Sequence, residues 1–251
     1  MEPETHAPLS RQCPAYKVEG SGPLLLFVAG IDGTGELFFK QAAHLACSFR
    51  VVSFRLREGS GFTYDDLADD CAAIVRDLGE RQATVVAESF GGAVAFSFAL
   101  RYPEMVERLV IINSFARFPN RLLIKAAARI APRVPLRLMW YLRKTANTLG
   151  LLVDGVKRED RRRFFEVIRT VNREGYARRL RLIAELDLEE RLAEIKAPTL
   201  FIAGDKDLLI RSVKEAQLMA ARMPNASIKV MAGAGHACLL GDRVRLADLL
   251  K

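Results

Sequence analysis

Short apolar runs alternate with amphipathic stretches along most of the chain. The runs are rich in Val, Ile and Leu and are apolar at consecutive positions, which is typical of strands buried on both faces of a parallel sheet. The predicted strands are 24–30, 50–56, 84–88, 109–114, 199–204 and 228–231, and the predicted helices are 36–46, 64–79, 90–101 and 242–250. Strands that alternate with helices in this way predict an α/β fold, with a mostly parallel sheet covered on both faces.

One stretch, 115–196, breaks the alternation. It lies between two predicted strands, but its own pattern is helical and contains no strand signal. We therefore expect residues 1–114 and 197–251 to form the core domain and residues 115–196 to form an inserted helical cap. Between Arg117 and Arg181 there are 18 Lys and Arg but only 5 Asp and Glu, whereas the whole chain has a net charge of +8. The excess positive charge therefore belongs to the cap.

The basic residues at the start of the cap are regularly spaced. They recur every four positions, which on a helix forms a slowly drifting stripe: Arg117, Arg121, Lys125, Arg129, Arg133 and Arg137. Pro132 and Pro135 must interrupt that helix. The stripe has two interpretations, a solvated outer face of the cap or a basic amphipathic surface that contacts anionic membranes. No nucleic-acid-binding motif accompanies it, so nucleic acid is not an expected partner.

The first candidate for chemistry is Ser89. An apolar run ends at this serine, and an apolar helical pattern begins at Phe90. A strand–turn–helix junction around small-x-Ser-x-Gly is typical of a nucleophile elbow, which exposes the serine hydroxyl on a strained turn. The residues two positions before and after Ser89 are Ala87 and Gly91. The usual pattern has glycine at the first of these positions, so Ala87 is a departure.

A serine hydroxyl is a weak nucleophile near neutral pH, and it needs a histidine that a carboxylate orients. On a nucleophile elbow the chain order is Ser, then Asp or Glu, then His. The histidines are at positions 6, 44 and 236, and only His236 follows Ser89. Asp205 and Asp207 both follow the strand 199–204. We favour Asp207 as the triad acid and expect Asp205 to shape the turn.

Backbone amides are the expected oxyanion donors. One is the amide of Phe90, after the nucleophile, and the other is that of Ile31 in the Gly-rich loop after the first strand. This loop lacks the glycine spacing of phosphate-binding loops. A carboxylate at Asp32 would oppose an oxyanion, so we expect it to turn away and cap the following helix. Together with Gly30 and Trp140, Asp32 is a candidate for the substrate-binding region.

Three segments carry a family resemblance: Gly-Ile-Asp-Gly-Thr-Gly at 30–35, Glu-Ser-Phe-Gly-Gly at 88–92, and Gly-Asp-Lys-Asp-Leu-Leu at 204–209 followed by Gly235-His236. They resemble the α/β-hydrolase superfamily, and more narrowly the esterase/lipase/thioesterase-like domain of phytyl ester synthases and their bacterial relatives. The resemblance implies acyl-ester chemistry through an acyl-serine, with Ser89, Asp207 and His236 as the triad. We expect a carboxylesterase or lipase-like hydrolase. The alternatives are an acyltransferase or thioesterase, and a non-catalytic ligand-binding relative.

The expected chemistry needs neither a metal nor an organic cofactor, and its expected partner is a small-molecule acyl ester. The cysteines lie at positions 13, 47, 71 and 238, a spacing that indicates neither a metal site nor a disulfide framework. The N-terminal residues show no signal-peptide pattern, and the apolar runs are too short to span a bilayer. We therefore expect a cytoplasmic protein.

Overall fold

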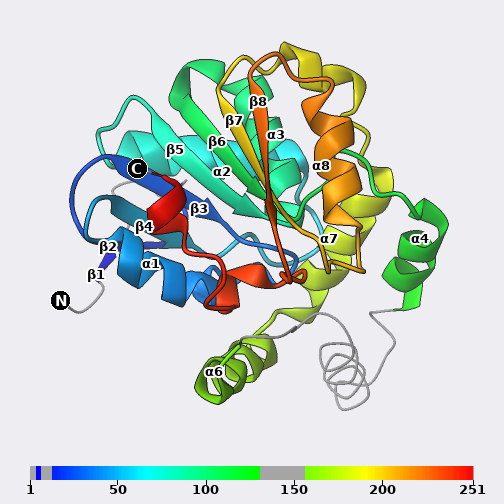
Figure 1. Cartoon of the computed structure of the whole chain (residues 1–251), viewed down its shortest axis with the longest axis horizontal. Helices are drawn as coiled ribbons and strands as arrows, with labels where there is room; N and C mark the ends of the chain where they lie inside the picture. The colour runs from blue at the N-terminus through cyan, green and yellow to red at the C-terminus, as the bar shows by residue number, and fades with distance from the viewer. Residues whose placement is uncertain (1–3, 7–12, 131–155, 251) are drawn as a thin grey trace.

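A computed structural model of the chain describes residues 4–6, 13–130 and 156–250. One eight-stranded sheet crosses the molecule in the order β1-β2-β4-β3-β5-β6-β7-β8 (Figure 1). The strands are β1 (Glu4–His6), β2 (Tyr16–Glu19), β3 (Leu24–Val28), β4 (Arg50–Phe54), β5 (Ala83–Glu88), β6 (Val106–Ile112), β7 (Thr199–Gly204) and β8 (Ala226–Met231). From β4 to β8 all neighbours pair in parallel, and β1 and β2 form an antiparallel edge. This confirms the predicted mostly parallel sheet.

The connections between strands define where a site can form. The helices are η1 (Glu36–Phe38), α1 (Phe39–Leu45), α2 (Tyr64–Asp77), α3 (Phe90–Arg101), η2 (Pro103–Met105), α4 (Arg121–Ile130), α6 (Arg158–Arg169), α7 (Arg173–Glu185), η5 (Glu190–Glu194), α8 (Ser212–Ala220), η6 (Cys238–Leu240) and α9 (Leu246–Leu249). From β3 the chain moves outward to β4 and then returns past β3 to β5. Right-handed crossovers therefore place α1 on one face and α2 and α3 on the other. The strand order reverses between β3 and β5, and ligands of such sheets bind at the carboxyl ends there.

Helix α2 shows how local sequence sets an element boundary. Thr63 accepts a hydrogen bond from the Asp66 amide, and the Asp66 carboxylate accepts one from the Thr63 amide, which forms a capping box. Gly79 follows the helix with a φ of +71°, a conformation that glycine adopts without strain. Leu67, Cys71, Ile74 and Val75 face the core. The helix packs on α3, in agreement with the predicted amphipathic pattern.

Some boundaries differ from the prediction. The helix expected at 36–46 is divided into η1 and α1, and the one expected at 242–250 is the short α9, Leu246–Leu249. The strands β1 and β2 and the helix α8 were not predicted. β2 is a four-residue strand between β1 and β4, too short to show clear alternation. α8 follows Arg211, which has a φ of +54° and provides no side-chain cap, so the usual helix-start signal is missing.

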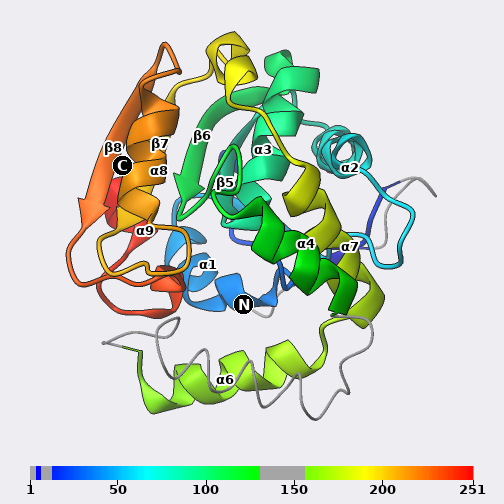
Figure 2. The same ribbon diagram turned by 90° about the vertical axis from the view of Figure 1, so that its right-hand side faces the viewer.

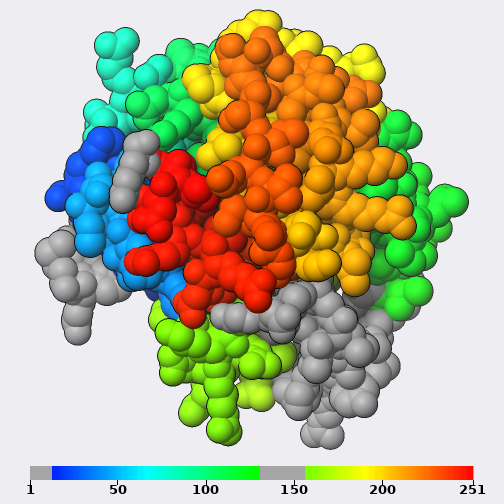
Figure 3. Space-filling model, in the orientation of Figure 1, coloured from blue at the N-terminus to red at the C-terminus, as the bar shows by residue number. Residues whose placement is uncertain are grey.

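The C-terminal segment is attached to α1 by one buried side chain. The Gln41 Nε2 donates to the carbonyls of Leu239 and Val244 at 2.8 Å each, and its Oε1 accepts from the Leu246 amide at 3.0 Å. In the space-filling view this segment (red) fills the surface between the N-terminal strands (blue) and β8 (orange) (Figure 3). These contacts fix the chain that follows His236.

Within 115–130 and 156–196, the described parts of the inserted stretch, the regular elements are α4, α6, α7 and η5, with no strand. α4 lies beside α7, and α6 lies apart from the sheet (Figure 2). Buried residues of α7 and of the chain after it belong to the same hydrophobic core as the sheet: Leu182, Ile183, Leu186, Leu192 and Ile195. The inserted stretch is therefore packed into the core at its C-terminal end.

Arg117 and Arg121 of the basic stripe make ion pairs. Arg117 pairs with Asp187 and Glu189, and Arg121 pairs with Asp187 and donates to the Ala184 carbonyl. These contacts hold α4 against the chain around the end of α7. α4 also exposes Leu122, Leu123 and Ile130.

Arg133, Arg137 and Trp140 lie outside the described residues. Contact of the stripe with anionic membranes stays a prediction. In the described ranges, no helix combines the length and apolarity that crossing a bilayer requires.

Candidate active site

Ser89 lies at a sharp turn between β5 and α3. Its backbone has φ +54° and ψ −119°, an uncommon conformation for a residue with a side chain. The neighbouring Gly91 lies against the end of β3: a Cβ there would be 2.3 Å from the Val28 carbonyl oxygen and 2.7 Å from that of Ala29. Ala87 is buried within β5, where it pairs with Val28 and Ile111. The strand and helix therefore approach as closely as the sequence pattern predicts.

The structure brings Ser89, Asp207 and His236 together from three loops, after β5, β7 and β8. His236 Nε2 is 3.0 Å from Ser89 Oγ, and His236 Nδ1 is 2.8 Å from Asp207 Oδ2. Asp205 instead accepts the Gly233 amide at 2.7 Å and shapes the turn there. One imidazole thus joins the serine to a buried carboxylate, the geometry that activates a hydroxyl nucleophile.

Hydrogen bonds keep the Asp207 carboxylate charged in spite of its burial. Desolvation alone would raise its pKa, but the bond to His236, the Ser212 hydroxyl and the Leu209 amide hold the pKa below its ordinary value. Burial of His236 favours the neutral ring, yet the bond to Asp207 and its charge raise the net pKa of His236 above the ordinary value. This carboxylate is therefore able to stabilise the imidazolium that forms when Ser89 loses its proton.

The predicted oxyanion donors are two backbone amides, those of Ile31 and Phe90. The Gly33 amide donates to the Gly30 carbonyl at 3.0 Å and closes a turn in the loop after β3. In a trans peptide the N–H points opposite to the C=O, so the Ile31 N–H points away from this turn. Phe90 is the first residue of α3, and its N–H has no partner within the helix. The loop touches the elbow, since a Cβ on Gly30 would be 3.7 Å from Ser89 Cβ.

Asp32 does not cap the following helix, so that prediction was wrong. Its Oδ1 accepts from the Thr34 amide at 2.9 Å and from the Thr34 hydroxyl at 2.5 Å, a turn within the loop itself. η1 begins after Gly35, and its first amide, that of Glu36, donates to the Thr34 hydroxyl at 3.2 Å and not to Asp32. Burial raises the pKa of Asp32 above its ordinary value, with Thr34 and the charge of Arg179 opposing the rise. The Asp32 carboxylate thus binds donors two residues away and does not reach the first amide of η1.

A second carboxyl, Glu88, directly precedes the serine. Burial raises its pKa to about 7, a rise that the charge of His236 opposes and those of Asp32 and Asp207 reinforce. Its charge therefore changes near neutral pH, beside the histidine that bonds to Ser89.

Asn113, which follows β6, was not among the predicted site residues. Its Nδ2 donates to the carbonyls of Gly235 and His236 at 2.9 and 2.7 Å, and its Oδ1 accepts from the Gly204 amide at 2.8 Å. It therefore ties the end of β7 to the histidine loop. A polar residue at the carboxyl end of a central strand was the signal that could have revealed it.

Ser114 also supports the elbow: its hydroxyl donates to the Ser89 carbonyl at 2.7 Å.

Of the predicted substrate-binding residues, Gly30 and Asp32 lie in the loop beside Ser89, whereas Trp140 is outside the described residues. In the part of the chain that the structure describes, no group of three or more His, Cys, Asp or Glu side chains is arranged to hold a metal ion.

Comparisons with known proteins agree with this architecture. The chain is 29% identical to a protein of Serratia proteamaculans (strain 568) provisionally named carbamate hydrolase RutD, over 91% of both chains. An esterase from Exiguobacterium antarcticum superposes with a TM-score of 0.84 at 17% identity, over 97% of this chain and 96% of that one. A hydrolase from Pseudomonas aeruginosa PA01 superposes with a TM-score of 0.81 at 24% identity, over 94% and 92%. The model of the alpha/beta hydrolase family matches residues 25–249, and the chain belongs to that family.

Proposed function

We propose that this protein is a serine hydrolase that cleaves carboxylic esters through an acyl-serine intermediate. The observation that carries the proposal is the His236 ring, with Ser89 Oγ 3.0 Å from one nitrogen and Asp207 Oδ2 2.8 Å from the other. This arrangement gives the serine a base and orients that base. The strained Ser89 backbone, which exposes a nucleophile at the end of β5, adds support.

In the proposed acylation step, Ser89 Oγ attacks the ester carbonyl carbon as its proton passes to His236 Nε2. The carbonyl oxygen becomes an oxyanion that the Ile31 and Phe90 amides stabilise. The intermediate then collapses, the bond from carbon to the leaving oxygen breaks, and His236 returns the proton to the alcohol. Asp207 remains ionised throughout and stabilises the imidazolium.

In the proposed second step, water attacks the acyl-serine while His236 accepts its proton. Collapse of the second tetrahedral intermediate releases the carboxylic acid and restores the Ser89 hydroxyl. An alcohol in place of water would give acyl transfer through the same acyl-serine, so the triad serves both reactions. A ligand-binding protein without catalysis would not need the three residues aligned, and their alignment favours an enzyme.

The test is hydrolysis of p-nitrophenyl esters with acyl chains from two to sixteen carbons. Wild type is compared with Ser89→Ala and with Ser97→Ala, a matched change on α3 where the hydroxyl donates to the Ala93 carbonyl at 2.9 Å. We expect turnover in wild type and Ser97→Ala and its loss in Ser89→Ala. Turnover that survives in Ser89→Ala, or a wild type inactive on all chain lengths, would contradict the proposal.

Carbamate hydrolysis is a second candidate, which the name of the Serratia proteamaculans relative favours. A carbamate presents the same carbonyl to Ser89, but a nitrogen takes the place of the α-carbon, the acyl-chain carbon bonded to the carbonyl. p-Nitrophenyl pentanoate and p-nitrophenyl N-propylcarbamate have the same shape and leaving group, so their kcat/KM ratio isolates this difference. We expect the ester to react faster, and a faster carbamate would replace the ester proposal.

A further inference from the structure

Arg179, on α7 of the inserted stretch, is buried against the loop after β3. Only 1% of its surface is exposed, and it is among the largest fully buried side chains in the described residues. Its Nε donates to the Ile31 carbonyl at 2.9 Å and its Nη2 to the Asp32 carbonyl at 3.1 Å. Its Nη1 donates to the Arg57 carbonyl, just beyond β4, at 3.1 Å. One guanidinium therefore joins α7, the predicted oxyanion loop and the end of β4.

The surroundings are shaped to admit this guanidinium. A Cβ on Gly33 would lie 2.6 Å from Arg179 Cζ, and one on Gly175 would lie 3.2 Å from Nη1. Larger side chains at these positions would collide with the group or press on it. Gly33 also has a φ of +69°. Both the loop and the start of α7 therefore have a glycine at the position that contacts the Arg179 guanidinium.

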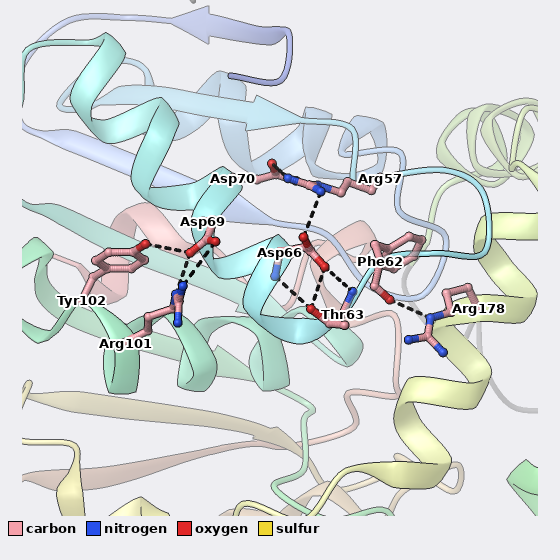
Figure 4. Close-up of polar contacts among 9 residues, drawn as sticks. All are labelled: Arg57, Phe62, Thr63, Asp66, Asp69, Asp70, Arg101, Tyr102 and Arg178. Carbon is pink, nitrogen blue, oxygen red and sulfur yellow. Dashed lines mark hydrogen bonds and ion pairs between the residues drawn. The ribbon is translucent and has the colours of Figure 1, made fainter. Parts of the chain in front are cut away.

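The hydrogen bonds of Arg179 go to main-chain carbonyls, while the charges of Asp32 and Glu58 also favour its cationic form. Burial lowers its pKa to about 10, so it is still cationic at neutral pH. Burying a charge is costly unless strong hydrogen bonds compensate. The planar guanidinium can hold several carbonyls in a fixed arrangement, which an ammonium cannot. Attachment of α7 does not itself require Arg179, because Leu182 and Ile183 lie in the main core and Arg178 donates to the Phe62 carbonyl at 2.6 Å (Figure 4).

Arg57, the third partner, is itself fixed. Its guanidinium bonds Asp70 at 2.8 and 2.9 Å and Asp66 at 3.2 Å, both on α2 (Figure 4). The Arg179 side chain thus connects the loop to a chain segment that α2 holds in place. Two of its bonds fix the peptide planes directly after Ile31, and the Gly33–Gly30 turn fixes the plane before it. All three planes around the Ile31 amide are held.

We propose that Arg179 is a positioning residue that holds the Ile31 amide in place as an oxyanion donor, so that the inserted stretch completes the catalytic centre. This inference rests on the proposed function of Ser89 and Ile31. Loss of the Arg179 guanidinium should therefore weaken stabilisation of the transition state and leave substrate binding unchanged.

The test compares the full chain as wild type, Arg179→Met, Arg179→Lys and the matched control Arg178→Met. A fluorophosphonate probe gives the concentration of active sites and the rate of Ser89 labelling. Kinetics with p-nitrophenyl butyrate are then expressed per active site, which removes any unfolded fraction. The affinity for a trifluoromethyl ketone, which forms a tetrahedral oxyanion on the serine, reports on the oxyanion hole directly.

We expect Arg179→Met to lower kcat on the order of 100-fold, the size of losing one oxyanion donor. KM should stay within about threefold, because substrate binding is retained. Labelling rate and ketone affinity should fall with kcat/KM. Arg179→Lys keeps the charge but not the planar arrangement, so it should also be impaired, and it carries the test if Arg179→Met does not fold. Arg178→Met should behave as wild type.

Two results would overturn the inference: equal behaviour of the Arg179 and Arg178 variants, or a rise in KM at unchanged kcat, which would make Arg179 a substrate-binding residue. If wild type is labelled but hydrolyses no ester, the proposed ester hydrolysis fails while the labelling rates still test Arg179. If Arg179→Lys and wild type are labelled at the same rate and bind the ketone equally, the positioning role fails and ester hydrolysis stands.

Discussion

The Asn113 side chain donates to the His236 carbonyl at 2.7 Å and accepts from the Gly204 amide at 2.8 Å. It therefore holds the loop that carries the histidine to the strand whose end carries Asp207. Asn113 also has a φ of +45°, which asparagine adopts more readily than most residues.

Replacing this asparagine should impair both stability and catalysis. We expect Asn113→Ala to lose about 1–3 kcal/mol of unfolding free energy, since it leaves buried partners unsatisfied. Its kcat should also fall at constant active-site concentration, because the His236 loop is no longer held. Urea unfolding and p-nitrophenyl ester kinetics measure the two effects. Asn225→Ala is the control, since that amide donates to the Lys196 carbonyl at an exposed site. Equal results for the two variants would contradict the assignment.

The two aspartates after β7 should differ sharply. Asp207→Asn removes the charge that stabilises the imidazolium, and we expect kcat to fall by about 10⁴-fold, as in triads of this kind. Asp205→Asn alters only a turn contact to Gly233 and should retain most activity. Steady-state kinetics of both variants decide the matter, and a larger loss in Asp205→Asn would reverse the assignment.

Glu88 should shift the pH dependence of the reaction. His236 must be neutral to act as a base, so kcat/KM should rise with pH through the pKa of His236, which is raised above its ordinary value. An ionised Glu88 stabilises the imidazolium, and its charge contributes to that rise. Glu88→Gln removes the charge, so the pKa of His236 should fall and the rising limb should move to lower pH.

The matched control is Glu104→Gln, an exposed position in η2. Profiles of kcat/KM from pH 5 to 9 measure the shift, and a limb that stays in place in Glu88→Gln would refute the coupling. Unfolding of the same variants across this pH range tests a second effect, on stability. The folded-state pKa of Glu88, about 7, lies above its ordinary value, so the protonated form is favoured on folding. Wild type should therefore lose stability as pH rises from about 4.5 to above 7, and Glu88→Gln should lose less.

Gly91 should tolerate no side chain. A Cβ there would lie 2.3 Å from a backbone oxygen, so Gly91→Ala must displace β3 or the elbow. We expect destabilisation of about 2 kcal/mol or more and loss of most activity. Gly61→Ala adds the same methyl where nothing lies within 4 Å and should leave both properties unchanged. Thermal unfolding and ester kinetics compare the pair, and a fully active Gly91→Ala would disprove the close approach.

Local sequence is enough to predict the alternating strands and helices, the elbow at Ser89, and the order of serine, aspartate and histidine. These features are local: apolar periodicity reflects burial of one element, and small residues around Ser89 reflect one tight turn. The capping box at Thr63 and the terminal Gly79 belong to the same class, because their partners lie within a few residues. β2 and α8 lacked such local signals and were missed.

Which polar groups come into contact depends on the folded chain as a whole. Asp32 found a partner two residues away and not at the helix start, a choice between neighbouring donors that composition does not resolve. Asn113 meets a histidine 123 residues later, and Arg179 meets Ile31 across 148 residues. Arg179 is one of many basic residues in its stretch, and its pattern resembles that of a solvated charge. Its role follows from burial and from three carbonyls that the fold brings together, which no local pattern encodes.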